Sequence, residues 1–236
     1  MKALVFSGGG MFGAYQVGAW KVLSQHFQPD MVIGASIGSL NAWMVACGAT
    51  PEALEQHWLA ESGMERPVFQ FPRRWHQGIL DPTYAHHTMR RMCTEGQRKL
   101  RVGIVLRRFP NLLHRTVIQD DNVTWKHLAA SCAIPAVFDL PLIDGIRYAD
   151  GGLLDPLPLF AARDMGATQI IGINCLSWGG FGNIPNAAQL RPAKRISLRP
   201  SRALQWNRQR VEQWIAMGER DATQFRNDPT HRRLLT

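Results

Sequence analysis

Short apolar runs alternate with more polar stretches over most of the chain. The apolar runs have the length and composition of strands that are buried on both faces. They cover residues 3–6, 31–33, 100–106 and 169–174. The stretches between them have the length of helices, and this alternation predicts a layered α/β fold.

Capping residues followed by proline mark where several helices should begin. Thr50-Pro51, Asp81-Pro82 and Asp155-Pro156 each combine a helix-capping side chain with a proline that suits the first helical turn. Together with the capping residue Thr124, they predict helices at 51–60, 82–93, 124–131 and 155–165. Asp144-Gly145 predicts a two-residue hairpin turn between two short strands.

Length and composition predict one domain over residues 1–236, because 236 residues with 45% hydrophobic content can build one substantial core. No apolar run approaches the roughly 18 residues of a spanning helix, and the N-terminus meets glycines too early for a signal peptide. The four cysteines lack metal-ligand spacing, so we expect no metal site and buried, reduced thiols in a cytoplasmic protein. They are Cys47, Cys93, Cys132 and Cys175.

The net charge of +9 indicates an anionic partner, and most of the excess lies in a basic, helical C-terminal segment of about 191–236. We expect this segment to make peripheral contact with an anionic membrane surface. A solvated basic helix face is the alternative. Nucleic acid is not expected as a partner, because no recognition motif accompanies the charge.

The stretch Gly34-Ala35-Ser36-Ile37-Gly38 has the G-x-S-x-G pattern of a nucleophile elbow, a sharp turn from a strand into a helix. Glycines permit such a turn around Ser36, and the following helix N-terminus favours a developing negative charge. The alternative is a glycine-rich turn in which the serine is incidental.

The first strand is followed by a glycine loop, in which Gly8, Gly9, Gly10 and Gly13 can present unpaired amides to an anion. The loop also satisfies the dinucleotide fingerprint, which requires an acidic residue at the end of the second strand. Asp30 instead precedes that strand. The loop is therefore interpreted as an oxyanion hole, with the amides of Gly9, Gly10 and Ile37 as donors.

A third glycine-bounded motif, Asp150-Gly151-Gly152, follows the predicted hairpin. In the order in which they occur, the three motifs resemble those of the patatin-like phospholipases, closely over about 1–50 and 120–175. The sequence departs from the family pattern at Met11, where many members carry a basic residue, and at Asp155, where asparagine is common.

The resemblance implies a three-layer α/β/α fold with a mainly parallel central sheet, related to the α/β hydrolases. It also implies a serine acyl hydrolase of phospholipase A or lysophospholipase type that cleaves lipid esters without a cofactor. Ser36 and Asp150 would form its catalytic dyad and pass through an acyl-enzyme. His231 is the one histidine that follows Asp150, and it lies in a tail that we expect to be loosely held, so a triad is not favoured.

Other functions remain open at this point. An acyltransferase or thioesterase of the same fold would pass the acyl group to another acceptor, and a non-catalytic lipid-binding regulator would keep the fold alone. A further hypothesis concerns the loop after the 169–174 strand, which carries Trp178 and Phe181 among glycines. It should emerge near Ser36 and line the acyl entrance, unless these aromatics pack in the core.

Overall fold

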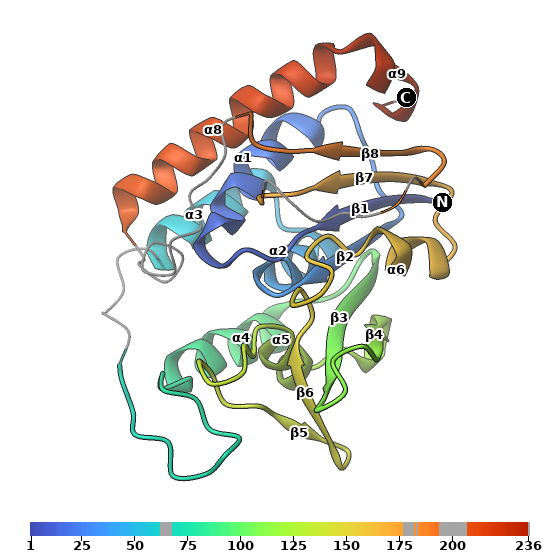
Figure 1. Cartoon of the computed structure of the whole chain (residues 1–236). Coiled ribbons are helices and arrows are strands. Elements are labelled where there is room, and N and C mark those ends of the chain that lie inside the picture. The colour runs from blue at the N-terminus through green and yellow to red at the C-terminus, as the bar shows by residue number, and fades with distance from the viewer. Residues whose placement is uncertain (62–67, 177–181, 183, 194–206, 236) are drawn as a thin grey trace.

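A computed structural model describes residues 1–61, 68–176, 182, 184–193 and 207–235 (Figure 1). The described residues form an eight-stranded sheet in the order β5-β6-β3-β2-β1-β7-β8, with β4 paired to β3. The strands are β1 Lys2–Phe6, β2 Met31–Ala35, β3 Arg101–Phe109, β4 Arg115–Gln119, β5 Leu142–Ile143, β6 Ile146–Asp150, β7 Gln169–Ile173 and β8 Ala187–Leu190.

The centre of the sheet is parallel. β1 pairs in parallel with β2 and β7, β2 with β3, and β7 with β8, whereas β4, β5 and β6 join through antiparallel pairs. The predicted α/β fold with a mainly parallel sheet is therefore confirmed. Parallel strands end at the same edge, so the loops after β1 and β2 lie side by side.

Helices cover both faces of the sheet, unequally. Alternate residues of β1 show the two faces: Leu4 and Phe6 pack under the larger helical layer, and Ala3 and Val5 pack against α6. The larger layer contains α1 Gly13–Leu23, α2 Ile37–Ala46, α3 Pro51–Glu61, α4 Thr83–Glu95, α5 Trp125–Ser131 and α8 Arg208–Asn227. α8 runs along α1 at the outside of this layer (Figure 1).

The helix predicted at 155–165 begins later than the sequence indicates, because α6 spans Leu159–Asp164. Two prolines explain the difference. Pro158 disfavours a helical backbone at the preceding residue, Leu157. The carbonyl of Pro156 is instead used outside the helix, where it accepts the amide of Gly8 at 2.8 Å.

Two other expectations need correction, and one is confirmed. Only Cys175 among the four free cysteines is fully buried. The C-terminal tail is not loose: it forms a 3-10 turn, Pro229–His231, and a short helix α9, Arg232–Leu235, and His231 stacks on Phe225. The Asp144-Gly145 hairpin is confirmed, with positive φ at both residues.

Candidate active site

Ser36 lies on a sharp turn between β2 and α2. Its φ is 54° and its ψ is −134°, a backbone conformation that a residue with a side chain rarely adopts. Gly34 and Gly38 allow this turn, since a Cβ on Gly34 would lie 2.2 Å from the Gly38 carbonyl oxygen, and one on Gly38 would lie 2.4 Å from that of Ser7. The tight turn places Ser36 at the carboxyl edge of the sheet.

The Ser36 hydroxyl contacts the Asp150 carboxylate directly. Its Oγ donates a hydrogen bond to Asp150 Oδ2 at 2.5 Å, and both residues are more than 90% buried. Asp150 is the last residue of β6 and pairs with Leu106 of β3. A Cβ on Gly151 would meet the Val105 carbonyl oxygen at 2.0 Å, so this glycine lets the chain after β6 pass close to β3.

Burial controls the acidity of Asp150. Loss of hydration raises the pKa of its carboxyl to about 6, although hydrogen bonds from Ser36 and from the Gly152 amide act in the opposite direction. The Gly152 amide donates to Oδ1 at 2.7 Å and orients the carboxylate, which leaves Oδ2 to face Ser36. The arrangement places a comparatively basic carboxylate against a serine hydroxyl.

The glycine loop lies beside this pair, but not all of its amides are available to a ligand. The Gly8 amide donates to Pro156, and the Gly13 amide donates within the 3-10 turn Gly10–Phe12. The amides of Gly9 and Gly10 bond to no group among the described residues. Gly8 and Gly13 therefore shape the loop, and Gly9 and Gly10 are its candidate anion donors.

Gly8 also brings the loop close to the serine. A Cβ on Gly8 would lie 3.1 Å from the Ser36 Cβ. The Ile37 amide is at the first position of α2 and bonds to no described group, so it joins Gly9 and Gly10 as a candidate donor.

A buried polar network, not identified from the sequence, holds the two ends of the glycine loop. Gln16 Nε2 donates to the Ser7 carbonyl oxygen at 2.6 Å, and its Oε1 accepts from Asn41 Nδ2 at 2.8 Å. Asn41 also donates to the Gly13 carbonyl and accepts from the Trp58 indole at 2.8 Å. The network ties the loop to α2 and α3.

Ser131 is another residue whose position the sequence did not reveal. Its Oγ accepts the Ser36 amide at 2.9 Å and donates to the Val105 carbonyl at 2.8 Å. It therefore links the elbow to β3 and leaves the Ser36 amide unavailable to substrate.

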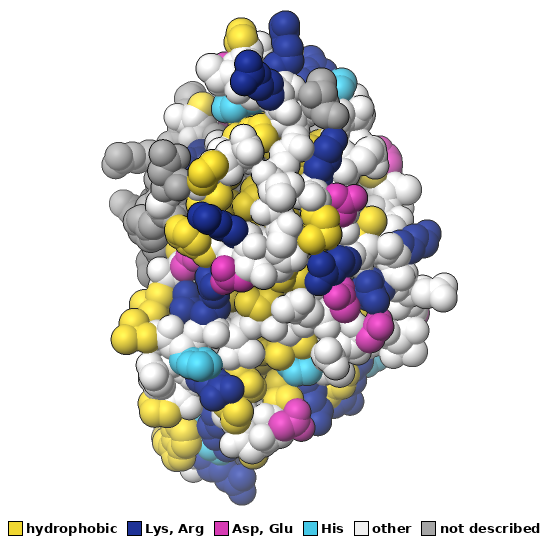
Figure 2. All heavy atoms as spheres, turned by 90° about the vertical axis from the view of Figure 1, so that its right-hand side faces the viewer, with side chains coloured by type: hydrophobic (Ala, Val, Ile, Leu, Met, Phe, Trp, Pro, Cys, Tyr) yellow, Lys and Arg dark blue, Asp and Glu magenta, His cyan; other side chains and the backbone are white. Residues whose placement is uncertain are grey.

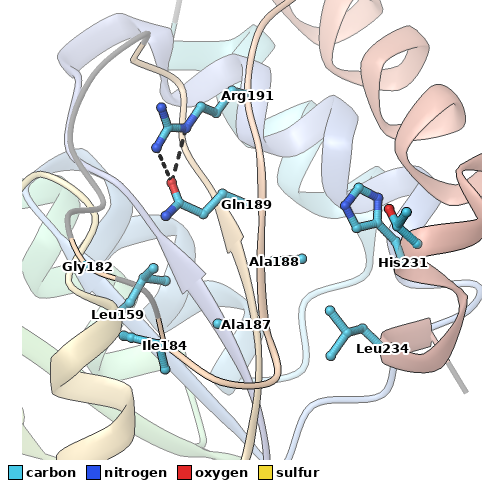
Figure 3. A pocket seen from close by; sticks show the side chains of 10 residues that line it. Leu159, Gly182, Ile184, Ala187, Ala188, Gln189, Arg191, His231 and Leu234 are labelled. Carbon is cyan, nitrogen blue, oxygen red and sulfur yellow. Dashed lines mark hydrogen bonds between the residues drawn. The ribbon is translucent and has the colours of Figure 1, made fainter.

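A pocket of about 470 Å³ lies elsewhere, along β8 and against α9 (Figure 3). Its lining includes Leu159, Ala187, Gln189, Leu234 and His231. Ser36, Asp150 and the glycine loop do not line it. His231 faces this pocket, and its Nδ1 lies 3.1 Å from the Phe225 carbonyl oxygen. These contacts lie within the C-terminal part of the chain, away from the Ser36–Asp150 pair.

The loop predicted to line an acyl entrance is only partly described. Trp178 and Phe181 fall outside the described residues. The residues before them, Cys175 and Leu176, lie against the glycine loop, because a Cβ on Gly9 would meet Cys175 Sγ at 2.5 Å and Leu176 Cδ2 at 3.3 Å.

The fold and the site define a class of layered α/β proteins in which a serine on a strand-to-helix elbow contacts a buried carboxylate. Within this class, the family described as "Patatin-like phospholipase" matches residues 4–163. The chain therefore belongs to the patatin-like phospholipase family.

Curated relatives agree with this assignment. Human 1-acylglycerol-3-phosphate O-acyltransferase PNPLA3 is 30% identical, and the match covers 68% of this chain and 36% of the relative. Triacylglycerol lipase ptl2 of Schizosaccharomyces pombe is 27% identical over 68% and 31%, respectively. Human patatin-like phospholipase domain-containing protein 5 is 30% identical over 66% and 38%. The matches thus span about a third of these relatives' lengths.

Among solved structures, VipD from Legionella pneumophila aligns over 91% of this chain and 66% of its own, with 13% identity and a TM-score of 0.48.

Proposed function

We propose that this protein is a serine acyl hydrolase that cleaves carboxylic esters of lipids through a Ser36–Asp150 dyad. The observation that carries the proposal is the direct 2.5 Å hydrogen bond between Ser36 Oγ and Asp150 Oδ2 on a strained elbow. Family membership supports lipid ester hydrolysis as the reaction class.

In the first half of the reaction, Ser36 Oγ attacks the ester carbonyl while its proton moves to Asp150 Oδ2. The tetrahedral intermediate collapses as Asp150 returns this proton to the leaving alcohol, which leaves an acyl-enzyme on Ser36. In the second half, Asp150 takes a proton from water as the water oxygen attacks the acyl-enzyme. The carboxylic acid leaves, and the proton returns to Ser36.

The negative oxygen of each intermediate would be held by the amides of Gly9, Gly10 and Ile37. Such donors stabilise the intermediate more than the ground state. In other serine hydrolases, loss of one donor raises the activation free energy by roughly 2.7–4 kcal/mol. The buried network holds both ends of the glycine loop and so keeps the Gly9 and Gly10 amides in place without rearrangement.

Hydrolysis of a panel of phospholipids, lysophospholipids and neutral glycerides, read by mass spectrometry, tests the proposal. Ser36→Ala and Asp150→Asn should each abolish turnover in a folded protein. His231→Ala is the matched control and should keep it. Labelling of Ser36 by a covalent serine probe would argue against a non-catalytic lipid-binding regulator. Asp150→Asn with wild-type turnover would refute the dyad.

Acyl transfer is the second candidate, favoured by the acyltransferase name of one relative. Both reactions share the acyl-enzyme and differ in whether water or an acceptor alcohol removes the acyl group. Assays with and without acceptors such as lysophosphatidic acid distinguish them. An acylated acceptor formed faster than free fatty acid would identify a transferase.

A further inference from the structure

Large hydrophobic side chains are exposed together at the end of the molecule formed by β5, β6 and the chain before α4. They come from residues 68–80, from the β3–β4 turn at 109–113 and from the hairpin at 142–147. The exposed members are Val68, Phe69, Phe71, Trp75, Ile79, Leu113 and Leu142, with Phe71 90% and Trp75 71% exposed. We call these three segments the docking surface.

Direct contacts join the three segments into one surface. The Trp75 ring stacks on Phe109 with 5.7 Å between centroids, and the Arg147 guanidinium lies 5.3 Å from the Trp75 centroid. The Leu140 amide, just before the hairpin, donates to the His76 carbonyl. Trp75 is therefore supported from behind while its outer face remains in solvent.

The exposed segment is held firmly on the protein. Ile79 and Leu80 donate backbone hydrogen bonds to Ala136 and Val137, and a Cβ on Gly78 would lie 2.4 Å from the backbone at Val137. Gln77 Oε1 accepts the amides of residues 73 and 74 and shapes the turn that presents Trp75. An apolar surface built in this way indicates a binding surface, since soluble proteins rarely expose large contiguous apolar patches.

The charge of the docking surface identifies its partner. Its three segments contain three arginines, at 73, 74 and 147, against one acidic residue, Asp144. Arg73 and Arg74 are exposed, and their guanidinium groups make no ion pair to a described residue. Aromatic rings interleaved with cations fit the interface of an anionic bilayer, where rings enter the headgroup region and cations meet phosphates. Figure 2, which faces the right-hand side of Figure 1, shows hydrophobic, basic and histidine side chains on the lower part of that face, with an acidic side chain among them.

The docking surface also lies toward the edge of the sheet that carries Ser36, the carboxyl edge of its parallel strands. β2 ends at Ala35, paired with Val105, and β3 continues from there to Phe109 beside β6. Arg147 is three residues before Asp150 in β6, about 10 Å along the strand. This extension, visible as the β5–β6 hairpin in Figure 1, points beyond the carboxyl edge.

We propose that the docking surface binds the interface of an anionic lipid bilayer and thereby holds the Ser36 edge of the sheet against its substrate. The second part, that the Ser36 edge is held against a lipid substrate, rests on the proposed function. The first part, binding to the bilayer, does not, and it can be measured without catalysis.

The test uses the Ser36→Ala protein, which leaves the lipids intact, and its sedimentation with phosphatidylcholine vesicles with and without phosphatidylglycerol. Phe71→Ser/Trp75→Ser should weaken binding by about tenfold or more because two anchoring rings are lost. Arg73→Gln/Arg74→Gln should weaken it on anionic vesicles alone. Phe160→Ser, which removes an exposed phenylalanine on α6, is the matched control and should bind like its parent.

Unaltered binding by the Phe71/Trp75 variant, with thermal unfolding matched to the parent, would overturn the proposal. A parent protein that dimerises through this surface and ignores vesicles in analytical ultracentrifugation would also overturn it, in favour of a second copy of the chain. If the wild-type protein, with Ser36 intact, binds vesicles but hydrolyses no lipid, the proposed function is refuted and the docking surface remains supported.

Discussion

At the scale of the residue, the placement of Asp150 opposes the stability of the fold. The side chain is 3% exposed, and burial raises its pKa from 3.8 to about 6. Its charged form, the one that can accept the Ser36 proton, is therefore disfavoured by its surroundings. Asp150 therefore contributes a pH dependence to both activity and stability.

Activity should rise with pH through about 6, because Asp150 must be ionised to accept the Ser36 proton. We expect kcat/KM on a short soluble ester to follow one titration in this region and to be level above it. Stopped assays in buffers of constant ionic strength would measure the profile. Loss of turnover in a folded His231→Ala protein would point to a triad instead.

Stability should show the opposite dependence. A raised pKa means that the folded protein binds a proton more tightly than the unfolded chain between pH 3.8 and about 6, so stability is lost as pH rises through this window. Asp150→Asn removes that loss and should raise the free energy of unfolding by up to about 3 kcal/mol at pH 8, with little gain at pH 4. Urea unfolding at both pH values measures the difference, and an equal gain at both would contradict the assignment.

At the scale of the element, a side-chain hydroxyl holds the elbow, and a close approach of two backbones holds the outer helices. Ser131 links the turn after β2 to β3. Gly18 and Gly218 let α1 and α8 approach until a Cβ on Gly218 would lie 2.1 Å from the Tyr15 carbonyl oxygen. The sequence indicates that Ser131, Gly18 and Gly218 lie in helices, but it does not show which backbone groups they contact.

Ser131→Ala should impair the elbow, because it leaves the buried Ser36 amide without an acceptor. We expect a cost of about 1–3 kcal/mol in stability and a fall in kcat with KM little changed, since the substrate site itself is intact. Thr94→Ala, which removes an exposed hydroxyl from α4, is the control. A rise in KM at constant kcat would contradict a positioning role for Ser131.

Gly218→Ala should separate α8 from α1. The added methyl has no room, so we expect the free energy of unfolding to fall by about 1–3 kcal/mol. Thermal unfolding followed by circular dichroism would report it. Gln213→Ala, an exposed position on the same helix, should change stability little or raise it slightly.

At the scale of the whole molecule, two surfaces could meet a membrane: the docking surface and the basic C-terminal segment at 191–236. Two ion pairs already involve the basic segment: Arg208 pairs with Glu212, and Lys21 of α1 pairs with Glu219. None of the helices in the described ranges is long and apolar enough to cross a bilayer.

The basic segment should add to the salt-sensitive part of membrane binding. Arg220→Gln/Arg226→Gln should weaken binding to anionic vesicles by on the order of 1 kcal/mol per residue at low salt and have little effect at high salt. Co-sedimentation across a salt series measures this. Binding indifferent to anionic lipid content and to salt would rule out a role for this charge.

The sequence by itself determined the features that depend on local backbone geometry. Buried strands appear as apolar runs, the Asp144-Gly145 turn requires residues that tolerate positive φ, and glycines around Ser36 are needed wherever a strand turns sharply into a helix. These signals lie within a few residues of the feature that they predict, so they can be read without the fold.

The tertiary structure alone decided what depends on contacts between distant segments. It decided that the Gly8 amide is taken by Pro156, that Ser131 occupies the Ser36 amide, and that Gln16, Asn41 and Trp58 join under the glycine loop. It also gathered the docking surface from three segments that lie far apart in the sequence. Such pairings depend on the packing of the whole sheet, and no local pattern records them.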